Sequence, residues 1–551
     1  MRLPPLLFAS IGLLTGLVPL SADVRMPGLF GDHMVLQQDT AIPVWGWAEP
    51  GEEVTVALGD RTAKTKAGAD GKWRVELPKI NASSTPQTLR ITGQNTVVIE
   101  DVLVGDVWLC SGQSNMEFGI FNIAKDEVLP PEVRLFHVTK SAALTPLDDT
   151  ASVPADVGRE VHSGHWQKSL NTGSWNGFSA VGFLFGKEIH QHTGKPVGLI
   201  GSYWGGTPAQ AWTSLAAMQK NPLLANYAQT YATLKPEQKA RFPVVWADYV
   251  RAGLKWDREV WGGAENYGKS FGQWQAAAKQ AKEAGTPAPP KPVPSRPKPA
   301  NPGNVGTVTS LFNGMIHPLI PYAFKGVIWY QGESNANNGA DYGNLFPAMI
   351  TDWREHWGRG DFPFLFVQVA GYGPGPTDPS RGRWAALREG QAKALGLPNT
   401  AMVTAIDVGD EKDIHPRNKF TVAHRLALAA REKVYNDKIA SSGPVYDHMT
   451  IEAGLIHIAF KHVGTGLVLA APPVAPGLPA MPSPTTLTGF EIAGSDQKWT
   501  PANAVIAGQT VIVSSPAVPA PVAVRYAWAD FPACSLYNAD GLPAFPFRTD
   551  N

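Results

Sequence analysis

The chain has 551 residues, of which 44% are apolar and 10% aromatic. This length and composition predict two to four globular domains with well-filled cores. The 47 basic and 47 acidic residues cancel. This balance excludes the strongly basic surface that nucleic acids and anionic membranes attract, so we expect neutral or small partners.

The first 22 residues have the composition of a signal peptide, with a basic residue at Arg2, an apolar middle up to Leu20 and small residues up to Ala22. A membrane anchor is the alternative. However, prolines at positions 4, 5 and 19 leave a helix-forming segment of only about a dozen residues, whereas a bilayer needs about 20. We expect cleavage after Ala22 and a soluble protein that is periplasmic or secreted.

Two regions consist of short strands separated by turn residues. Residues 23–100 alternate apolar and polar positions, which predicts an N-terminal β-sandwich. Its Trp45, Trp47 and Trp73 would suit a sugar-binding platform or core packing, and core packing is the more common use of such aromatics. Residues 439–551 predict a second β-sandwich, which could bind carbohydrate.

Residues 101–438 alternate strands with helices, which is typical of a doubly wound parallel sheet in an α/β fold. Helices are expected at residues 180–192, 347–357, 384–395 and 419–434, and strands at 133–138, 325–330, 362–369 and 400–407. Residues 216–284 also look helical, and a proline-rich, extended stretch follows them. We interpret residues 216–305 as an insertion near the functional site, with the prolines forming a return strap.

The sequence offers little for metal binding. Cys110 lies in a buried-strand pattern and Cys534 in a loop pattern. We expect Cys110 to be a packed thiol, and a disulfide between the two cysteines is the alternative. Two cysteines alone cannot complete a four-ligand zinc site. His190 and His192 point in different directions on one helix. We expect no metal and no cofactor.

Ser114 is a candidate nucleophile, because an apolar strand pattern over residues 102–110 ends in the turn Ser-Gly-Gln-Ser-Asn. The alternative is an ordinary serine that caps a helix after a strand. Two later stretches, residues 326–335 and 407–416, also place polar residues directly after an apolar strand. Parallel strands deliver functional side chains at their carboxyl ends, so the three stretches predict one shared site.

Three motifs carry a family resemblance: Gly-Gln-Ser-Asn-Met at 112–116, Trp-Tyr-Gln-Gly-Glu-Ser-Asn at 329–335 and Asp-Ile-His-Pro-Arg-Asn-Lys at 413–419. They resemble the sialate O-acetylesterase-like family of SGNH hydrolases, and the similarity runs from about Gly28 to the end of the chain. The resemblance implies an SGNH-type, flavodoxin-like three-layer α/β fold with flanking β-sandwich domains. It also implies a carbohydrate acetylesterase, since the family contains sialate esterases and bacterial enzymes that deacetylate plant polysaccharides such as xyloglucan.

A serine hydroxyl needs a base to take its proton, and imidazole suits this role at neutral pH. Of the 13 histidines, only His415 follows a predicted strand and has carboxylates in the few residues that precede it. We therefore assign His415 as the base for Ser114 and then as the acid for the leaving sugar oxygen.

The third member of the triad has more than one candidate in the sequence. Asp413 lies two residues before His415, so in extended backbone both side chains leave the same face. SGNH enzymes usually place this aspartate three residues before the histidine, where this chain has Lys412. We choose Asp413, with Asp410 and Asp407 as alternatives.

Ester hydrolysis also needs donors for the developing oxyanion. We expect the backbone N–H of Ser114, an amide of Gly205 or Gly206, and a side-chain amide from Gln331 or, second, Asn335. The glycines are adjacent after a strand, and by resemblance they match the block that supplies an oxyanion amide.

Two further positions complete the expected site. Trp204 and Asn115 are predicted to bind substrate. Glu333 might be mistaken for a glycosidase carboxylate, but no partner is spaced for it, so we expect it to hold its loop by hydrogen bonds. An enzyme acting on sialate would need an arginine for the sugar carboxylate. The loop-to-helix segment with Arg381, Arg383 and Arg388 could supply one, although such arginines are more often surface residues.

The sequence therefore predicts a secreted serine esterase that removes acetyl groups from carbohydrate. The alternatives are a sialate O-acetylesterase, a non-catalytic carbohydrate-binding protein, and a glycosidase or peptidase using a similar cleft. The aromatic insertion and two β-modules favour a long neutral polysaccharide, with xyloglucan as the specific choice. We expect a monomer whose partner is the acetylated carbohydrate, with no nucleic acid and no membrane contact after signal cleavage.

Overall fold

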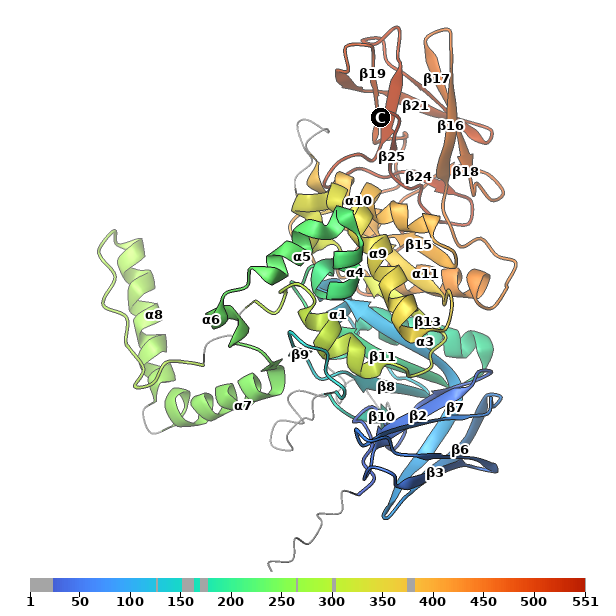
Figure 1. The fold of residues 1–551 in the computed structure, drawn as a ribbon. Helices are drawn as coiled ribbons and strands as arrows, with labels where there is room; N and C mark the ends of the chain where they lie inside the picture. Colours follow the sequence, from blue (N-terminus) through green and yellow to red (C-terminus); the bar gives the residue numbers. More distant parts are fainter. Residues whose placement is uncertain are drawn as a thin grey trace, which may run out of the picture.

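The computed structural model describes residues 23–124, 127–150, 163–168, 177–263, 266–299, 304–373 and 382–550. The expected signal peptide and Arg381 lie outside these residues. Figure 1 shows N-terminal strands at one end, a central α/β body, and C-terminal sheets at the other end, with a helical arm projecting from the middle.

One long strand, β7 (Thr96–Gly112), joins the N-terminal sheet to the central sheet. Its first half pairs antiparallel with β6 (Ser83–Thr92), and its second half pairs parallel with β11 (Val197–Tyr203) and β13 (Gly326–Tyr330). The boundary expected between residues 100 and 101 therefore falls inside a strand.

The large sheet has 11 strands, and its main path runs β10-β8-β11-β7-β13-β14-β15. The further strands are β8 (Val133–His137), β10 (Trp166–Lys168), β14 (Phe364–Gln368) and β15 (Thr400–Thr404). In chain order, strands β7, β11, β13, β14 and β15 follow the doubly wound order 2-1-3-4-5, with β8 added outside β11. The predicted α/β class is confirmed. The sheet is mixed rather than purely parallel, because β10 pairs antiparallel with β8 at one edge. In addition, the antiparallel strands β3 (Glu53–Leu58), β4 (Arg61–Lys66) and β6 join it through β7.

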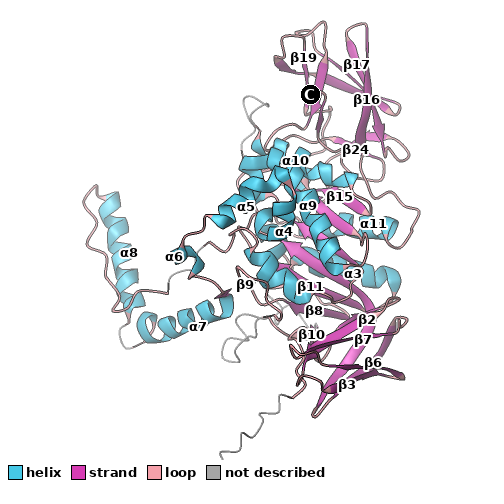
Figure 2. Cartoon of the chain, in the orientation of Figure 1, coloured by secondary structure: helices cyan, strands magenta, loops and turns pink. Residues whose placement is uncertain are grey.

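Helices cover both faces of the central sheet, as Figure 2 shows. Leu109 and Trp329 belong to the core on one face, with side chains of α9 (Gly339–Trp357) and α10 (Arg383–Ala392). Trp108, Cys110 and Ile328 belong to the core on the other face, with α3 (Ala180–Thr193) and α11 (Lys419–Lys433). Side chains alternate along a strand, so continuous apolar runs fill both faces and give three layers.

The predicted helices form close to their expected positions, with one clear exception. Helix α9 begins at Gly339, well before the predicted start at Pro347. The proline predicts a helix start, because proline is common at the first helical position. However, Tyr342, Leu345 and Phe346 precede it and are buried, and their packing stabilises the helical turns before the proline. None of the helices in the described residues combines the length and apolar character needed to cross a bilayer.

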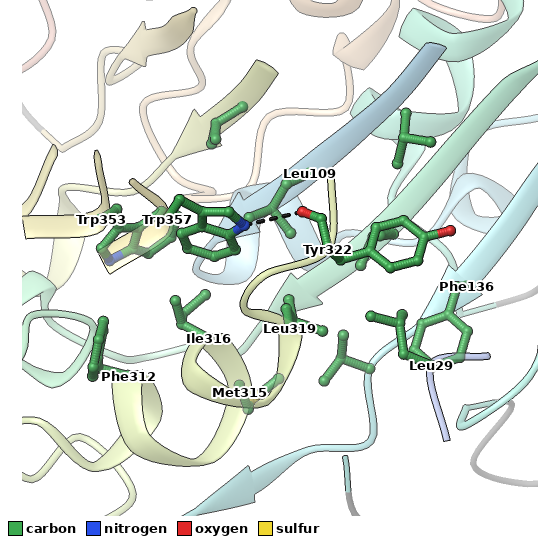
Figure 3. Close-up of a cluster of buried hydrophobic side chains, with 14 of the residues drawn as sticks. Leu29, Leu109, Phe136, Phe312, Met315, Ile316, Leu319, Tyr322, Trp353 and Trp357 are labelled. Carbon is green, nitrogen blue, oxygen red and sulfur yellow. Dashed lines mark hydrogen bonds between the residues drawn. The ribbon is translucent and has the colours of Figure 1, made fainter. Parts of the chain in front are cut away.

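A buried aromatic cluster fastens the N-terminal strands to the central body (Figure 3). Trp357 donates its indole N–H to the carbonyl of Tyr322 at 3.0 Å, and the Tyr322 hydroxyl donates to the carbonyl of Val35 at 2.6 Å. Trp45 packs edge-on against Tyr322, and Trp73 is buried. These two tryptophans therefore contribute to packing.

The insertion forms a chain of helices: α4 (Leu215–Lys220), α5 (Ala225–Ala232), α6 (Pro236–Lys239), α7 (Trp246–Trp256) and α8 (Tyr267–Glu283). Helices α7 and α8 project away from the body in Figure 1, and α8 buries no residue. The proline-rich stretch returns along them. The indole N–H groups of Trp256 and Trp274 donate to the carbonyls of Arg296 and Pro289 at 2.8 and 2.9 Å.

The C-terminal part contains two four-stranded antiparallel sheets, β16-β17-β22-β21 and β20-β19-β23-β25. Their strands are β16 (Val445–Glu452), β17 (Leu455–Lys461), β19 (Phe490–Ala493), β20 (Trp499–Pro501), β21 (Asn503–Ala507), β22 (Thr510–Ser514), β23 (Ala523–Tyr526) and β25 (Phe547–Arg548). Ile458 and Val513 of the first sheet share a core with Ile492 and Val524 of the second. Cys110 and Cys534 are both free thiols, so the disulfide left open by the sequence does not form here.

Candidate active site

Ser114 begins the one-turn helix α1 (Ser114–Glu117) directly after β7. Gly112 makes this turn possible: its φ is +140°, and a Cβ there would lie 2.1 Å from the carbonyl oxygen of Tyr330 on β13. The Gln113 side-chain oxygen accepts from the backbone N–H of Ser334 at 3.1 Å. The serine therefore lies at the point between β7 and β13 where the strand order reverses, which is where open α/β sheets bind ligands.

The glycine pair Gly205-Gly206, which follows β11, lies close to Ser114. A Cβ on Gly205 would lie 3.2 Å from Ser114 Cβ, and Gly206 has a φ of +73°. The Gly205 N–H donates to the Glu117 carboxylate at 2.5 Å, and Lys140 forms an ion pair with the other oxygen of that carboxylate. No acceptor in the described part of the chain takes the N–H of Ser114 or Gly206. Both amides therefore remain available as donors.

His415 lies on the loop between β15 and α11 and is partly exposed. An Asp413 carboxylate oxygen accepts the backbone N–H of His415 at 2.8 Å and lies 3.6 Å from the imidazole Nδ1. Asp410 instead accepts the backbone N–H groups of Lys412 and Asp413 at 2.8 and 3.1 Å. Asp413 is therefore the carboxylate beside the imidazole, and Asp410 shapes the turn.

The Ser114 and His415 segments are held together by Asn115. Its side-chain amide donates to the carbonyl of Ile414 at 3.0 Å, which joins the residue after Ser114 to the residue before His415. Within the described residues, no hydrogen bond joins the Ser114 hydroxyl to the imidazole. In free enzymes such bonds are often long and tighten only when substrate binds.

The surroundings of His415 keep its imidazole neutral. Burial and the Lys419 ammonium lower the pKa of His415, whereas the carboxylates of Asp413 and Glu117 act in the opposite direction. A lowered pKa leaves the ring unprotonated at neutral pH, which is the form that can accept a proton from a serine.

The structure places the two predicted side-chain amides in the packing below the serine. Gln331 is buried, and its amide nitrogen lies within hydrogen-bond distance of oxygens of Gln113, Thr207 and Asn335. Asn335 donates to the side chain of Gln210 at 2.9 Å. Because the two N–H bonds of Gln331 already face protein acceptors, neither is free for an oxyanion in this structure.

The two predicted substrate-binding residues are also covered. Asn115 is 1% exposed, and both of its side-chain polar atoms bond to protein groups. Trp204 is buried, with the Trp246 ring edge-on at 5.7 Å between centroids and the Lys140 ammonium 5.4 Å from its ring centre. Both residues support the site from beneath instead of facing solvent.

Arg388 does not lie ready for a sugar carboxylate, whereas Arg383 is exposed. Arg388 is fully buried and donates to four backbone carbonyls, those of Val369, Ala370, Ala529 and Asp530. Arg383 donates to the Asn337 side chain at 2.9 Å. Arg388 therefore fastens the C-terminal sheets to the central body.

Asp407, the other alternative for orienting His415, has a different set of partners. Its two oxygens bind the Arg425 guanidinium at 2.7 Å each, and one also accepts the Tyr537 hydroxyl at 2.8 Å. The side chains of Arg425 and Asp407 are 3% and 0% exposed. Asp407 is thus part of a buried ion pair that joins α11 to the C-terminal sheets.

This burial gives a stability prediction. Asp407→Asn leaves Arg425 as an uncompensated buried charge, so we expect it to lower the free energy of unfolding by about 3–5 kcal/mol. Chemical denaturation measures this, with the exposed Asp496→Asn as a control that should change stability little. Activity per folded molecule should be retained. Loss of activity without loss of stability would instead make Asp407 the partner of His415.

Three charged residues near the serine were not assigned from the sequence. Glu117 and Lys140 meet beside Gly205, and Lys419 is buried against Asn115. Glu117 had a local signal, because it lies three residues after Ser114 and therefore on the same side of a helical turn. Lys419 closes the third motif, but its direction could not be read from spacing.

Comparisons with known proteins point to one family. The family model described as "Carbohydrate esterase, sialic acid-specific acetylesterase" matches residues 308–432, which include the second and third motifs. The chain is 31% identical to the sialate O-acetylesterase of Rattus norvegicus over 570 residues, covering 95% of this chain and 94% of that protein. It is 31% identical to that of Mus musculus over 593 residues, covering 99% and 98% of the two chains.

A solved structure extends the similarity to the whole fold. The crystal structure of a carbohydrate acetylesterase from Xanthomonas citri superposes with a TM-score of 0.74 at 33% identity, covering 96% of this chain and 100% of that one. Identity of this extent over nearly the full length covers all three motifs as well as the β-rich ends. The chain therefore belongs to the sialate O-acetylesterase family of carbohydrate esterases and is a carboxylic ester hydrolase that acts on O-acetyl groups.

Proposed function

We propose that this esterase is an exported, SGNH-type enzyme that removes acetyl groups through Ser114, His415 and Asp413, with a plant cell-wall glycan, best xyloglucan, as its substrate. The observation that carries the mechanism is the hydrogen bond from Asn115 to Ile414, which holds the serine turn against the histidine loop. The Asp413 carboxylate beside Nδ1 supplies the third member.

The chemistry follows from the arrangement. The Ser114 hydroxyl attacks the acetyl carbonyl while His415 takes its proton, and the imidazolium then returns that proton to the departing sugar oxygen. Water, activated by the same imidazole, releases acetate and restores the serine. The N–H groups of Ser114 and Gly206 stabilise the oxyanion, and Gly205 can join them when its bond to Glu117 opens.

The surroundings of the serine favour a neutral sugar. Lys140 is the cation next to the glycine pair, and the Glu117 carboxylate already neutralises it. The insertion passes beside the same place, because Trp246 at the start of α7 packs on Trp204. Its projecting aromatic arm provides additional surface for a long polymer rather than a single sugar.

The test compares acetate release from acetylated xyloglucan, acetylxylan and O-acetyl sialic acid under one set of conditions. We expect the highest kcat/KM on acetylated xyloglucan. The second candidate is sialate O-acetyl hydrolysis, which the names of the mammalian relatives favour. A preference for O-acetyl sialic acid would reject the plant-glycan substrate and leave the mechanism standing.

A further inference from the structure

Three polar side chains form a buried network under the serine turn. The Asn115 amide nitrogen donates to Glu333 at 2.5 Å and to the Ile414 carbonyl at 3.0 Å, and its oxygen accepts from the Lys419 ammonium. Lys419 is 0% exposed and Asn115 is 1% exposed. Both N–H bonds and the oxygen of one asparagine are therefore used to join three distant segments.

The network connects the places where the proposed catalytic groups are attached to the fold. Asn115 follows Ser114 in α1, Glu333 begins the turn after β13, and Lys419 begins α11 four residues after His415. No direct ion pair joins Glu333 to Lys419 among the described residues, so the asparagine amide is the bridge between the two. Through Ile414 it also reaches the backbone next to the imidazole.

We propose that Asn115, Glu333 and Lys419 are positioning residues that set the placement of His415 relative to Ser114. This inference rests on the proposed roles of Ser114 and His415. All three side chains are buried, so we assign them no direct contact with substrate, and one oxygen of Glu333 is buried without a hydrogen-bond partner among the described residues. They act through the two segments that carry the reacting groups.

Burying these charged groups costs free energy, which suggests that the network has a role beyond packing. Burying an ammonium and a carboxylate is expensive, and apolar side chains of similar volume often give equal or greater stability. Burial lowers the pKa of Lys419 to about 7 and raises the pKa of Glu333. The ammonium lies 5.0 and 5.4 Å from the ring centres of Phe118 and Tyr330, which partly compensates for lost water.

Lys419 also acts on His415 through its charge. The charged groups that face the imidazole are Lys419 on α11, Asp413 on the same loop and Glu117 on α1, which is itself paired with Lys140. The Lys419 ammonium disfavours a protonated imidazole, whereas the two carboxylates favour it. Below pH 7 the lysine is charged, so it extends the range of the neutral, active base toward lower pH.

The test is Lys419→Met, assayed for kcat, KM and the pH dependence of kcat/KM on p-nitrophenyl acetate. We expect kcat to fall about 10²-fold through misplacement of the reacting groups, with KM changing much less. The acidic limb of the profile should move to higher pH, because the charge that opposed imidazole protonation is gone. Lys433→Met, an exposed lysine at the end of the same helix, is the matched control and should match the wild type.

Two further variants separate position from charge and from folding. Glu333→Gln keeps an oxygen that accepts from Asn115, so kcat should fall less than 10-fold. Glu333→Gln with Lys419→Met leaves no unpaired buried charge and should fold even if Lys419→Met does not; it should still show the shifted acidic limb. A wild-type kcat and pH profile in the folded Lys419 variants would overturn the positioning role. If Ser114→Ala keeps activity, the proposed function itself fails instead.

Discussion

Ser114→Ala is expected to lower kcat/KM for both p-nitrophenyl acetate and the acetylated glycan by about 10⁴-fold or more. The hydroxyl forms the acyl bond in the proposed mechanism, and serine hydrolases lose activity on this scale without their nucleophile. The fold should be unaffected, because the side chain makes no hydrogen bond within the described residues. Acetate release and thermal denaturation of the same preparation measure the two effects.

A matched control makes this result specific. Ser495→Ala changes an exposed serine in the C-terminal part and should leave both activity and stability unchanged. A fluorophosphonate probe should label the wild type and the Ser495 variant once per chain and should not label the Ser114 variant. Substantial acetate release by Ser114→Ala would move the nucleophile elsewhere and reject the proposed mechanism.

His415→Gln is expected to produce the second largest loss, about 10³–10⁴-fold in kcat/KM, because His415 takes the serine proton in the proposed mechanism. The pH dependence distinguishes this loss from misfolding. In the wild type, activity falls as the pH drops through the lowered pKa of His415, since the protonated ring cannot act as a base. The glutamine variant should lose this limb and depend on hydroxide instead. An unchanged acidic limb would assign it to another group.

A comparison of two aspartates refines the assignment of the third member. Asp413→Asn should cost less than the histidine change, about 10–10²-fold. Its side chain is 58% exposed and lies 3.6 Å from the imidazole, so water weakens its field. Asp410→Asn should have a smaller effect, because Asp410 caps backbone amides. A larger loss in Asp410→Asn would reverse the assignment.

The local parts of this protein could be predicted from short stretches of sequence. Apolar runs give the strands that end before Ser114, Gln331 and His415, and 3.6-residue periodicity gives α3 and α11 almost to the residue. Each of these signals depends on neighbours in the chain. Pro347 shows the limit of such rules. Proline often begins a helix, but α9 already begins at Gly339, because several residues between them are buried against the core.

The sequence by itself determined which strand ends carry reactive side chains, because a serine turn, a glycine pair and a histidine loop are each encoded within a few residues. Only the tertiary structure decided which polar groups face the site and which lie beneath it. Asn115 reads as a partner for substrate until Ile414, Glu333 and Lys419 surround it. Those partners lie more than 200 residues away in the chain, and the direction of a side chain depends on the packing of such distant segments, which no local pattern contains.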